Sequence, residues 1–136
     1  MRRLLVDSSV WIQYLRDADA ALCDRVEMAL SPGGGDEVVM CGPVAMELRM
    51  GASERQLPAV TRIVEGLPLV ALDESVDWSS AASLRRLASA QGAQVRALPD
   101  CVIAAVAIRT GSVVVHRDRD FELLAEVSPL QQERWG

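Results

Sequence analysis

The chain contains no lysine, and all 14 of its basic residues are arginine. A phosphate-binding P-loop requires a Gly-Lys-Ser/Thr motif, so the glycine-rich stretch at residues 32–35 is interpreted as a turn. Schiff-base chemistry and phosphoaspartate folds that use a phosphate-binding lysine are excluded for the same reason. The absence of lysine therefore removes several enzyme classes before any motif is considered.

Histidine and cysteine are also scarce. His116 is the single histidine, and the three cysteines, Cys23, Cys41 and Cys101, are widely spaced with no Cys-x-x-Cys pair. This pattern favours three reduced, mostly buried thiols over a disulfide or a zinc site. Any metal site in this chain must therefore be built from oxygen ligands.

Long apolar runs are missing as well. No stretch reaches the roughly 18 residues of a membrane span, and the N-terminal apolar run is short and ends at Asp7. We therefore expect no signal peptide, no membrane contact and a cytoplasmic protein. With 136 residues, half of them apolar, the chain is long enough for one compact domain, which we expect to span residues 1–136.

Short apolar runs that predict strands alternate with helical patterns along the whole chain. Predicted strands lie at 3–7, 38–41, 67–72 and 112–115, with a short one near 127–130. The first predicted helix begins at Ser8 or Ser9, and the others cover 20–30, 42–51, 55–65, 75–90, 99–108 and 119–126. Such alternation predicts an α/β fold of three layers, α/β/α, with a central, mostly parallel sheet.

Four acidic positions follow apolar strands or begin apolar helices: Asp7, Glu47, Asp100 and Asp118, the last with Asp120 two residues on. The carboxyl ends of parallel strands meet at one edge of a sheet, so these acids are expected to share a cleft there. Their five charges equal the whole net charge of -5. A hard divalent cation is the usual occupant of such an acidic site.

Each acid also has a structural explanation when it is taken singly. Asp7 precedes a helix that it could cap, although Ser8 and Ser9 are cap candidates too, and Glu47 could be solvated beside Arg49. Asp100 lies in a first helical turn, which favours a carboxylate by about 0.3–1 kcal/mol. Asp118 and Asp120 lie in a charged loop, and Asp120 could cap the last helix.

The four segments LLVDSSVWI, PVAMELRMG, PDCVIAAVA and VVVHRDRDF, in this order and over residues 4 to about 126, resemble the PIN-domain family. The resemblance is greatest to the VapC-type toxins of bacterial toxin–antitoxin pairs. It implies a PIN-like fold and a catalytic quartet at Asp7, Glu47, Asp100 and Asp118, with Asp120 as a further metal ligand.

The resemblance further implies an endoribonuclease that depends on Mg²⁺ or Mn²⁺ and cleaves tRNA, rRNA or mRNA to inhibit translation. A VapB-type antitoxin and a homodimer are the implied partners. Asp7 and Asp100 would be the central metal ligands, with Asp118 completing a second metal position. The alternative is a catalytically silent PIN-like module that binds another protein.

One residue departs from the family pattern. The last motif commonly has Thr or Ser where this chain has His116, so the hydroxyl that would help to order the acids is either absent or replaced by the imidazole. Ser9 is a candidate to orient Asp7 or to hold a metal-bound water. Arg49, Arg117 and Arg119 are candidates for RNA phosphates or an antitoxin carboxylate.

Overall fold

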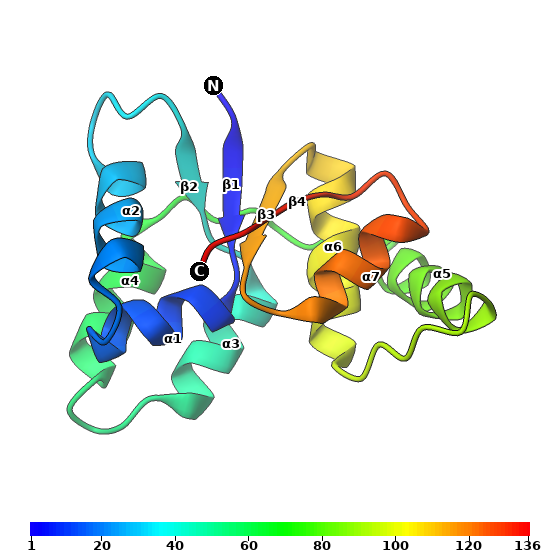
Figure 1. Ribbon diagram of the computed structural model, residues 1–136, viewed down its shortest axis with the longest axis horizontal. Coiled ribbons are helices and arrows are strands. Elements are labelled where there is room, and N and C mark those ends of the chain that lie inside the picture. The colour runs from blue at the N-terminus through cyan, green and yellow to red at the C-terminus, as the bar shows by residue number, and fades with distance from the viewer.

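The computed structural model describes all residues from Met1 to Gly136. Its four strands are β1 (Arg3–Val6), β2 (Glu37–Val39), β3 (Val113–His116) and β4 (Gln131–Arg134). Its seven helices are α1 (Ser8–Arg16), α2 (Ala20–Leu30), α3 (Gly42–Gly51), α4 (Leu57–Gly66), α5 (Asp77–Ala90), α6 (Leu98–Thr110) and α7 (Arg119–Glu126) (Figure 1). The predicted α/β fold is thus confirmed, although the four helices from α3 to α6 follow one another with no strand between them.

The sheet has the strand order β2-β1-β3-β4, and every pair in it is parallel. The chain moves from β1 outward to β2, and then crosses back to β3 on the other side of β1. The carboxyl ends of β1 and β3 therefore flank the point where the strand order reverses, which is where open α/β sheets bind their ligands. Asp7 directly follows β1, and Asp118 lies two residues after β3.

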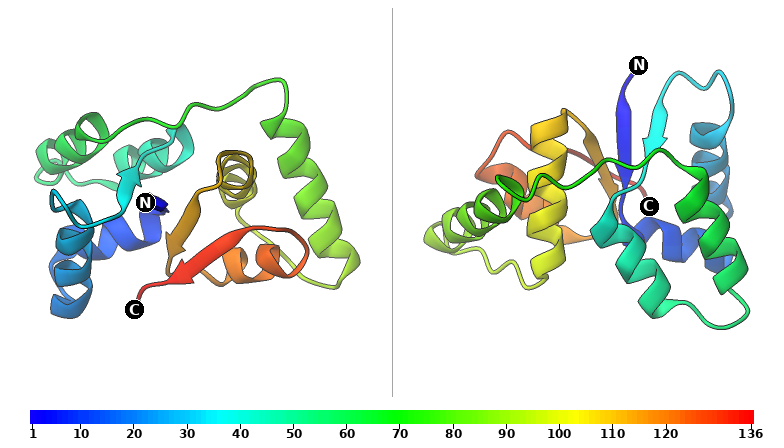
Figure 2. Two further views of the ribbon diagram at one scale, coloured as in Figure 1. Left: turned by 90° about the horizontal axis from the view of Figure 1, so that it is seen from above. Right: turned by 180° about the vertical axis from the view of Figure 1, so that it is seen from behind.

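Helices cover both faces of the sheet, which gives the expected three layers. Figure 2 shows α1 and α2 on one side, with α3, α4 and α6 on the other and α5 outside α6. The last three residues of β1 and all of β3 are buried, as expected for parallel strands covered on both faces. Helix α6 is almost wholly apolar; its second residue is Pro99, and it ends at Gly111 in the left-handed conformation.

Two of the strand predictions were wrong. Residues 67–72 form no strand, and only Leu69 bridges to Met40. Leu69 is largely exposed, so the apolar composition of this stretch does not reflect burial in the sheet. The final strand lies at 131–134 instead of near 127–130. Its sequence QQER has no apolar pattern because β4 is an edge strand that pairs with β3 alone.

The apolar side chains at helical spacing along α5 are only partly buried. Ala81 and Leu84 are buried against the core, whereas Trp78 and Leu87 are about half exposed. Trp78 lines an almost wholly apolar surface hollow, the Trp78 hollow, with Gly42, Pro43, Met46 and residues 69–72. None of the helices is both long enough and apolar enough to cross a membrane.

A buried ion pair fixes α6 to α5. Asp77 is fully buried and accepts hydrogen bonds from Arg109 Nε and Nη2, at 3.0 and 2.8 Å, and from the Asp73 amide at 2.8 Å. Arg109 Nη2 also donates to the Ala71 carbonyl at 2.7 Å. The guanidinium holds the pKa of the Asp77 carboxyl below its usual value. This pair orients the helix whose first turn carries Asp100.

Arg109→Ala is expected to destabilise the fold by about 3 kcal/mol, because it leaves the Asp77 carboxylate buried without a cation. The value is at the low end for such pairs because the Arg109 side chain is 32% exposed. Because the pKa of Asp77 is lowered, the difference from the wild type should shrink as the pH falls below the ordinary Asp pKa of 3.8. Urea denaturation at pH 7 and pH 3 measures both quantities.

The matched control is Arg16→Ala, since Arg16 is exposed and forms no ion pair. It should change the free energy of unfolding by no more than about 0.5 kcal/mol. Equal stabilities for the two variants would contradict the role of the Asp77–Arg109 pair.

Candidate active site at the carboxyl ends of β1 and β3

Asp7 serves both local structure and the site. Its Oδ2 accepts hydrogen bonds from the Ser9 amide at 3.0 Å and the Ser9 hydroxyl at 2.6 Å, so Asp7, and not Ser8 or Ser9, caps α1. Its amide donates to the Val115 carbonyl at 2.8 Å, which ties it to β3. The other oxygen, Oδ1, is buried and has no hydrogen-bond partner. Capping therefore accounts for one carboxylate oxygen and leaves the other free.

Asp100 occupies the first turn of α6, where the predicted helix begins. The residue is 3% exposed, and its Oδ2 is buried without a hydrogen-bond partner. A helix N-terminus favours a carboxylate by about 0.3–1 kcal/mol, up to about 2 kcal/mol in partly buried sites, which is small beside the cost of burying an unpaired charge. Position in the helix therefore does not explain why this acid is buried.

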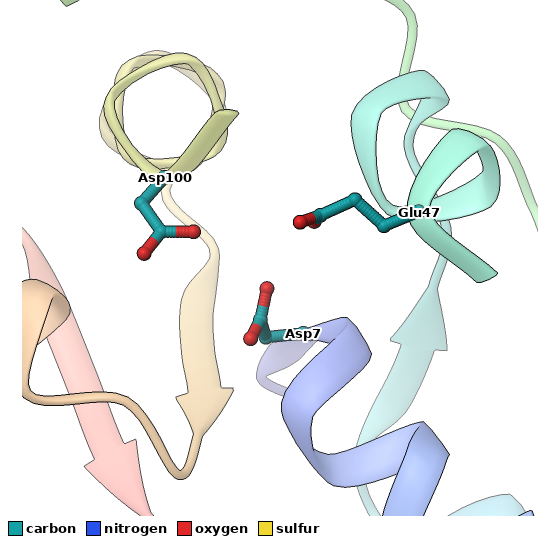
Figure 3. Close-up of side chains that lie close together, drawn as sticks. All are labelled: Asp7, Glu47 and Asp100. Atoms are coloured by element: carbon teal, nitrogen blue, oxygen red, sulfur yellow. The ribbon is translucent and has the colours of Figure 1, made fainter. Parts of the chain in front are cut away.

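Glu47 completes the first group of acids. It is half-buried on α3, and its Oε1 accepts a hydrogen bond from the Ser8 hydroxyl at 3.2 Å. It forms no ion pair with Arg49, the partner that its spacing suggested. One carboxylate oxygen from each of Asp7, Glu47 and Asp100 lies within 4.8 Å of the others. Figure 3 shows the three side chains, from three different elements, pointing toward one another.

Asp118 and Asp120 form a second group with Asp100, again with one oxygen of each within 4.8 Å of the others. Asp118 caps α7, because its Oδ1 accepts from the Asp120 amide at 2.9 Å; the predicted cap, Asp120, lies inside that helix. Asp120 Oδ2 accepts from the amides of Arg96 and Ala97 at 3.3 and 3.4 Å. Asp100 thus belongs to both groups and links them.

His116 makes a contact that helps to order the acids, in the place where the family pattern has a hydroxyl. The side chain is fully buried, and its Nδ1 accepts a hydrogen bond from the Asp118 amide at 3.1 Å. Its Nε2 lies 2.6 Å from Gln132 Oε1, so the ring donates at Nε2 and accepts at Nδ1. The neutral imidazole therefore holds the turn that presents Asp118. Ser9 has a similar role, since its hydroxyl accepts from the Arg117 amide at 3.0 Å while donating to Asp7.

Burial and mutual repulsion make this cluster electrostatically unfavourable on its own. Burial, followed by the nearby charges of Asp7, Asp118 and Glu47, raises the pKa of Asp100 to about 9. Burial also raises the pKa of Asp7, against the lowering effect of its hydrogen bonds to Ser9. The pKa of Glu47 is raised by burial and then by the charge of Asp7. At neutral pH the cluster therefore retains at least one proton unless a cation is bound.

The donors present fit a divalent cation with a preference for oxygen. All five side chains offer carboxylate oxygens, and burial raises the thiol pKa of the nearby Cys41 to about 12 and raises that of Cys101, next to Asp100, as well. Two buried oxygens, Asp7 Oδ1 and Asp100 Oδ2, have no other partner. Buried carboxylate oxygens are normally hydrogen-bonded or bound to a metal. A hard cation such as Mg²⁺ or Mn²⁺ prefers oxygen ligands and would give both buried oxygens a partner.

The structure adds residues that the sequence analysis did not identify as part of the site. Ser8 holds Glu47, Gln132 holds His116, and Arg96 lies in the loop that Asp120 binds. Of the three arginines that were singled out, Arg117 pairs with Asp19 at 3.6 Å, whereas Arg49 and Arg119 form no ion pair. Ser8 could have been found from its position next to Asp7, but no local pattern marks Gln132 or Arg96.

Asp100→Asn is expected to stabilise the metal-free protein increasingly as the pH rises from about 4 toward 9. A raised carboxyl pKa means that the folded state holds a proton that the unfolded state releases, so this group lowers stability throughout that interval. The change is at most about 1.4 kcal/mol per pH unit for one group. Urea denaturation in EDTA at pH 5 and pH 8 measures it, and a smaller advantage at pH 8 than at pH 5 would contradict the assignment.

Comparison with known proteins agrees with this geometry. Residues 4–127 match the PIN domain family. Ribonuclease VapC11 of Mycobacterium tuberculosis is 38% identical over 129 residues, which cover 94% of this chain and 96% of that protein.

Two solved structures are similar throughout. VapBC2 from Rickettsia felis, bound to a DNA fragment from its promoter, matches with a TM-score of 0.78 at 14% identity, over 98% of this chain and 99% of that one. VapBC-5 from Mycobacterium tuberculosis, a member of the VapBC family of toxin-antitoxin systems, matches with a TM-score of 0.71 at 25% identity, over 99% and 100%. The chain therefore belongs to the PIN-domain family and, within it, to the VapC-type proteins.

Proposed function

We propose that this protein is a metal-dependent endoribonuclease that acts in the cytoplasm as the toxin of a toxin–antitoxin pair and cleaves RNA to inhibit translation. Ribonuclease VapC11, its relative at 38% identity, bears the name of that activity. The structural observation that supports the proposal best is the pair of buried, unpartnered oxygens on Asp7 and Asp100. Retaining two such oxygens is unfavourable for a protein that binds no cation.

Asp7, Glu47 and Asp100 would hold one cation, and Asp100, Asp118 and Asp120 are placed for a second. The carboxylate-only donor set favours Mg²⁺, with Mn²⁺ as a substitute. When bound, the metal supplies Lewis acidity toward a phosphodiester and toward water.

The remaining groups of the site orient these ligands. Ser9 fixes the rotamer of Asp7, Ser8 fixes Glu47, and the His116 ring holds the backbone of Asp118. These bonds leave Asp7 Oδ1 directed at the space between the carboxylates before a cation binds. Little side-chain ordering therefore accompanies the binding of the cation. In the metal-free protein the Asp100 carboxyl holds a proton, which must leave before this residue can bind a cation.

The silent protein-binding module is supported less well. A module that had lost catalysis would have no need to bury facing carboxylates, and replacing any one of them by an apolar residue would relieve the repulsion. The departure from the family pattern at His116 is an argument for that alternative, since it leaves room for a module without catalysis. Because the imidazole accepts the Asp118 amide, this argument loses its force.

We propose a VapB-type antitoxin and a second copy of the chain as protein partners. Two apolar surfaces are left uncovered: the Trp78 hollow and a groove lined by Trp11, Tyr14, Leu15, Leu30, Ala59, Arg62, Ile63, Gly66 and Leu67. Uncovered apolar surface of this kind is typical of interaction sites. Light scattering at micromolar concentration tests the homodimer, and a monomeric mass would contradict it.

The wild-type protein, free of antitoxin, is expected to cut total RNA into discrete fragments with Mg²⁺ or Mn²⁺ and not with EDTA. Asp100→Asn should reduce the rate at least a hundredfold, because it removes an anionic ligand common to both metal positions. Gel electrophoresis followed by end sequencing of the fragments measures the rate and identifies the cleavage site.

The matched control is Asp24→Asn, the same change at an exposed acid on α2, which should cut at the wild-type rate. Cleavage that persists in EDTA would contradict the metal requirement. No cleavage by folded wild-type protein with either metal would favour the protein-binding module.

Mg²⁺ or Mn²⁺ alone, without RNA, is expected to raise the melting temperature of the wild type, because only the folded state assembles the carboxylates. At a metal concentration 100 times the dissociation constant the stabilisation is about 2.7 kcal/mol. Asp7→Asn and Asp100→Asn should lose this response while remaining folded. Scanning calorimetry with and without the ion is the measurement, and an unchanged response in both variants would place the metal elsewhere.

A further inference from the structure

A second feature lies directly beside the acidic cluster. A mostly polar surface hollow of about 360 Å³ is lined by Gly92, Ala93, Gln94, Arg96, Arg119, Asp120 and Leu123; we refer to it as the Arg96 hollow. Asp120 belongs to both places, since its carboxylate also lies in the second group with Asp100 and Asp118. A molecule lying in the Arg96 hollow is therefore next to the candidate active site.

The Arg96 hollow carries two positive charges that no carboxylate of the chain neutralises. Arg96 and Arg119 are exposed and form no ion pair, whereas Arg2, Arg3, Arg25, Arg109, Arg117 and Arg134 all do. The single acid of the hollow, Asp120, directs one oxygen to backbone amides. Two guanidinium groups are thus available for an anion, and guanidinium binds phosphate through two parallel hydrogen bonds.

The backbone around Arg96 is anchored on both sides. Asp120 Oδ2 accepts from the amides of Arg96 itself and of Ala97, and Arg85 Nε donates to the Val95 carbonyl at 3.2 Å. The Val95 side chain, immediately before Arg96, is buried in the core. The loop between α5 and α6 therefore presents Arg96 from a fixed position, which reduces the entropy lost when it binds a ligand.

We infer that the Arg96 hollow binds the phosphodiester backbone of single-stranded RNA next to the bond that is cut, with Arg96 and Arg119 contacting phosphates. This inference rests on the proposed function. A cluster of five carboxylates repels a polyanion, so a strand entering the site needs cations beside it. The contacts would be independent of base sequence, because phosphates are the same in every nucleotide.

The test is binding of a fluorescein-labelled, single-stranded RNA 12-mer of mixed sequence, measured by anisotropy over a range of KCl concentrations. Ca²⁺ replaces Mg²⁺, and gels monitor the integrity of the RNA. The double variant Arg96→Ala/Arg119→Ala is expected to bind at least tenfold more weakly than the wild type. The slope of log affinity against log salt should be shallower by about 1.4, since each phosphate contact on a single strand contributes about 0.7.

Three further arms distinguish this role from general effects of charge or folding. Arg16→Ala removes one exposed, unpaired arginine at the end of α1 opposite Asp7 and should bind like the wild type. Arg96→Lys should retain the salt slope and lose only part of the affinity. In cleavage assays with Mg²⁺, the double variant should raise KM more than it lowers kcat, and the melting shift caused by Mg²⁺ should be unchanged.

Equal RNA affinity for the wild type and the double variant would overturn the inference, even if the wild type cleaves RNA. Failure of the wild type to cleave RNA would reject the proposed function, and the binding arm would still decide the role of the Arg96 hollow. If poly-glutamate of equal length displaces the labelled RNA as effectively as unlabelled RNA does, the hollow is a site for an acidic peptide, which also overturns the inference.

Discussion

Electrostatic repulsion among carboxylates at the carboxyl ends of β1 and β3 is the constraint on which the rest of the site depends. Asp7 and Asp100 are 2% and 3% exposed, and each keeps one oxygen without a partner. In a low-dielectric setting such groups are tolerated when they are protonated or when a cation is close. The raised pKa of Asp100 shows the first solution, and the oxygen-only donor set provides for the second.

The surrounding structure restrains these acids without neutralising them. Asp7 and Asp118 each cap the helix that follows, so the same short turn that begins a helix also fixes a ligand. Hydroxyl donors from Ser8 and Ser9 hold two acids from the side, and the Asp77–Arg109 pair holds the helix that bears a third. Hydrogen bonds to a carboxylate favour its charged form, which is the form that binds metal.

His116 illustrates how an imidazole can hold the backbone of an acidic residue where the family pattern has a hydroxyl. A small hydroxyl residue and a neutral imidazole both accept a hydrogen bond from a backbone amide. Here Nδ1 makes that bond to Asp118, while Gln132 engages the other ring nitrogen and selects the tautomer. The sequence departs from the family pattern, yet the backbone turn that presents the acid is held.

Positive charge is arranged around this acidic centre, not within it. Arg96 and Arg119 lie beside Asp120, at the edge of the second group of acids, and neither forms an ion pair. An acidic interior with arginines at its edge fits the polyanionic substrate that we propose. Because the negative charge is concentrated in the acidic cluster and arginines lie beside it, a net charge of -5 does not argue against a nucleic-acid substrate.

The sequence by itself determined where most of the helices and strands lie and which acidic residues are candidate metal ligands. Apolar runs, prolines at helix starts and strand–helix alternation are local signals, and they placed Asp7, Asp100 and Asp118 at element ends. Local signals failed at residues 67–72 and at β4, where pairing and exposure follow from neighbours distant in sequence. Only the tertiary structure decided which oxygens lack a partner, that Ser8 holds Glu47 from 39 residues away, and that Arg96 lies beside Asp120. The reason is physical: helix and strand signals act within a few residues, whereas burial, repulsion and hydrogen bonds across the site depend on how the elements pack.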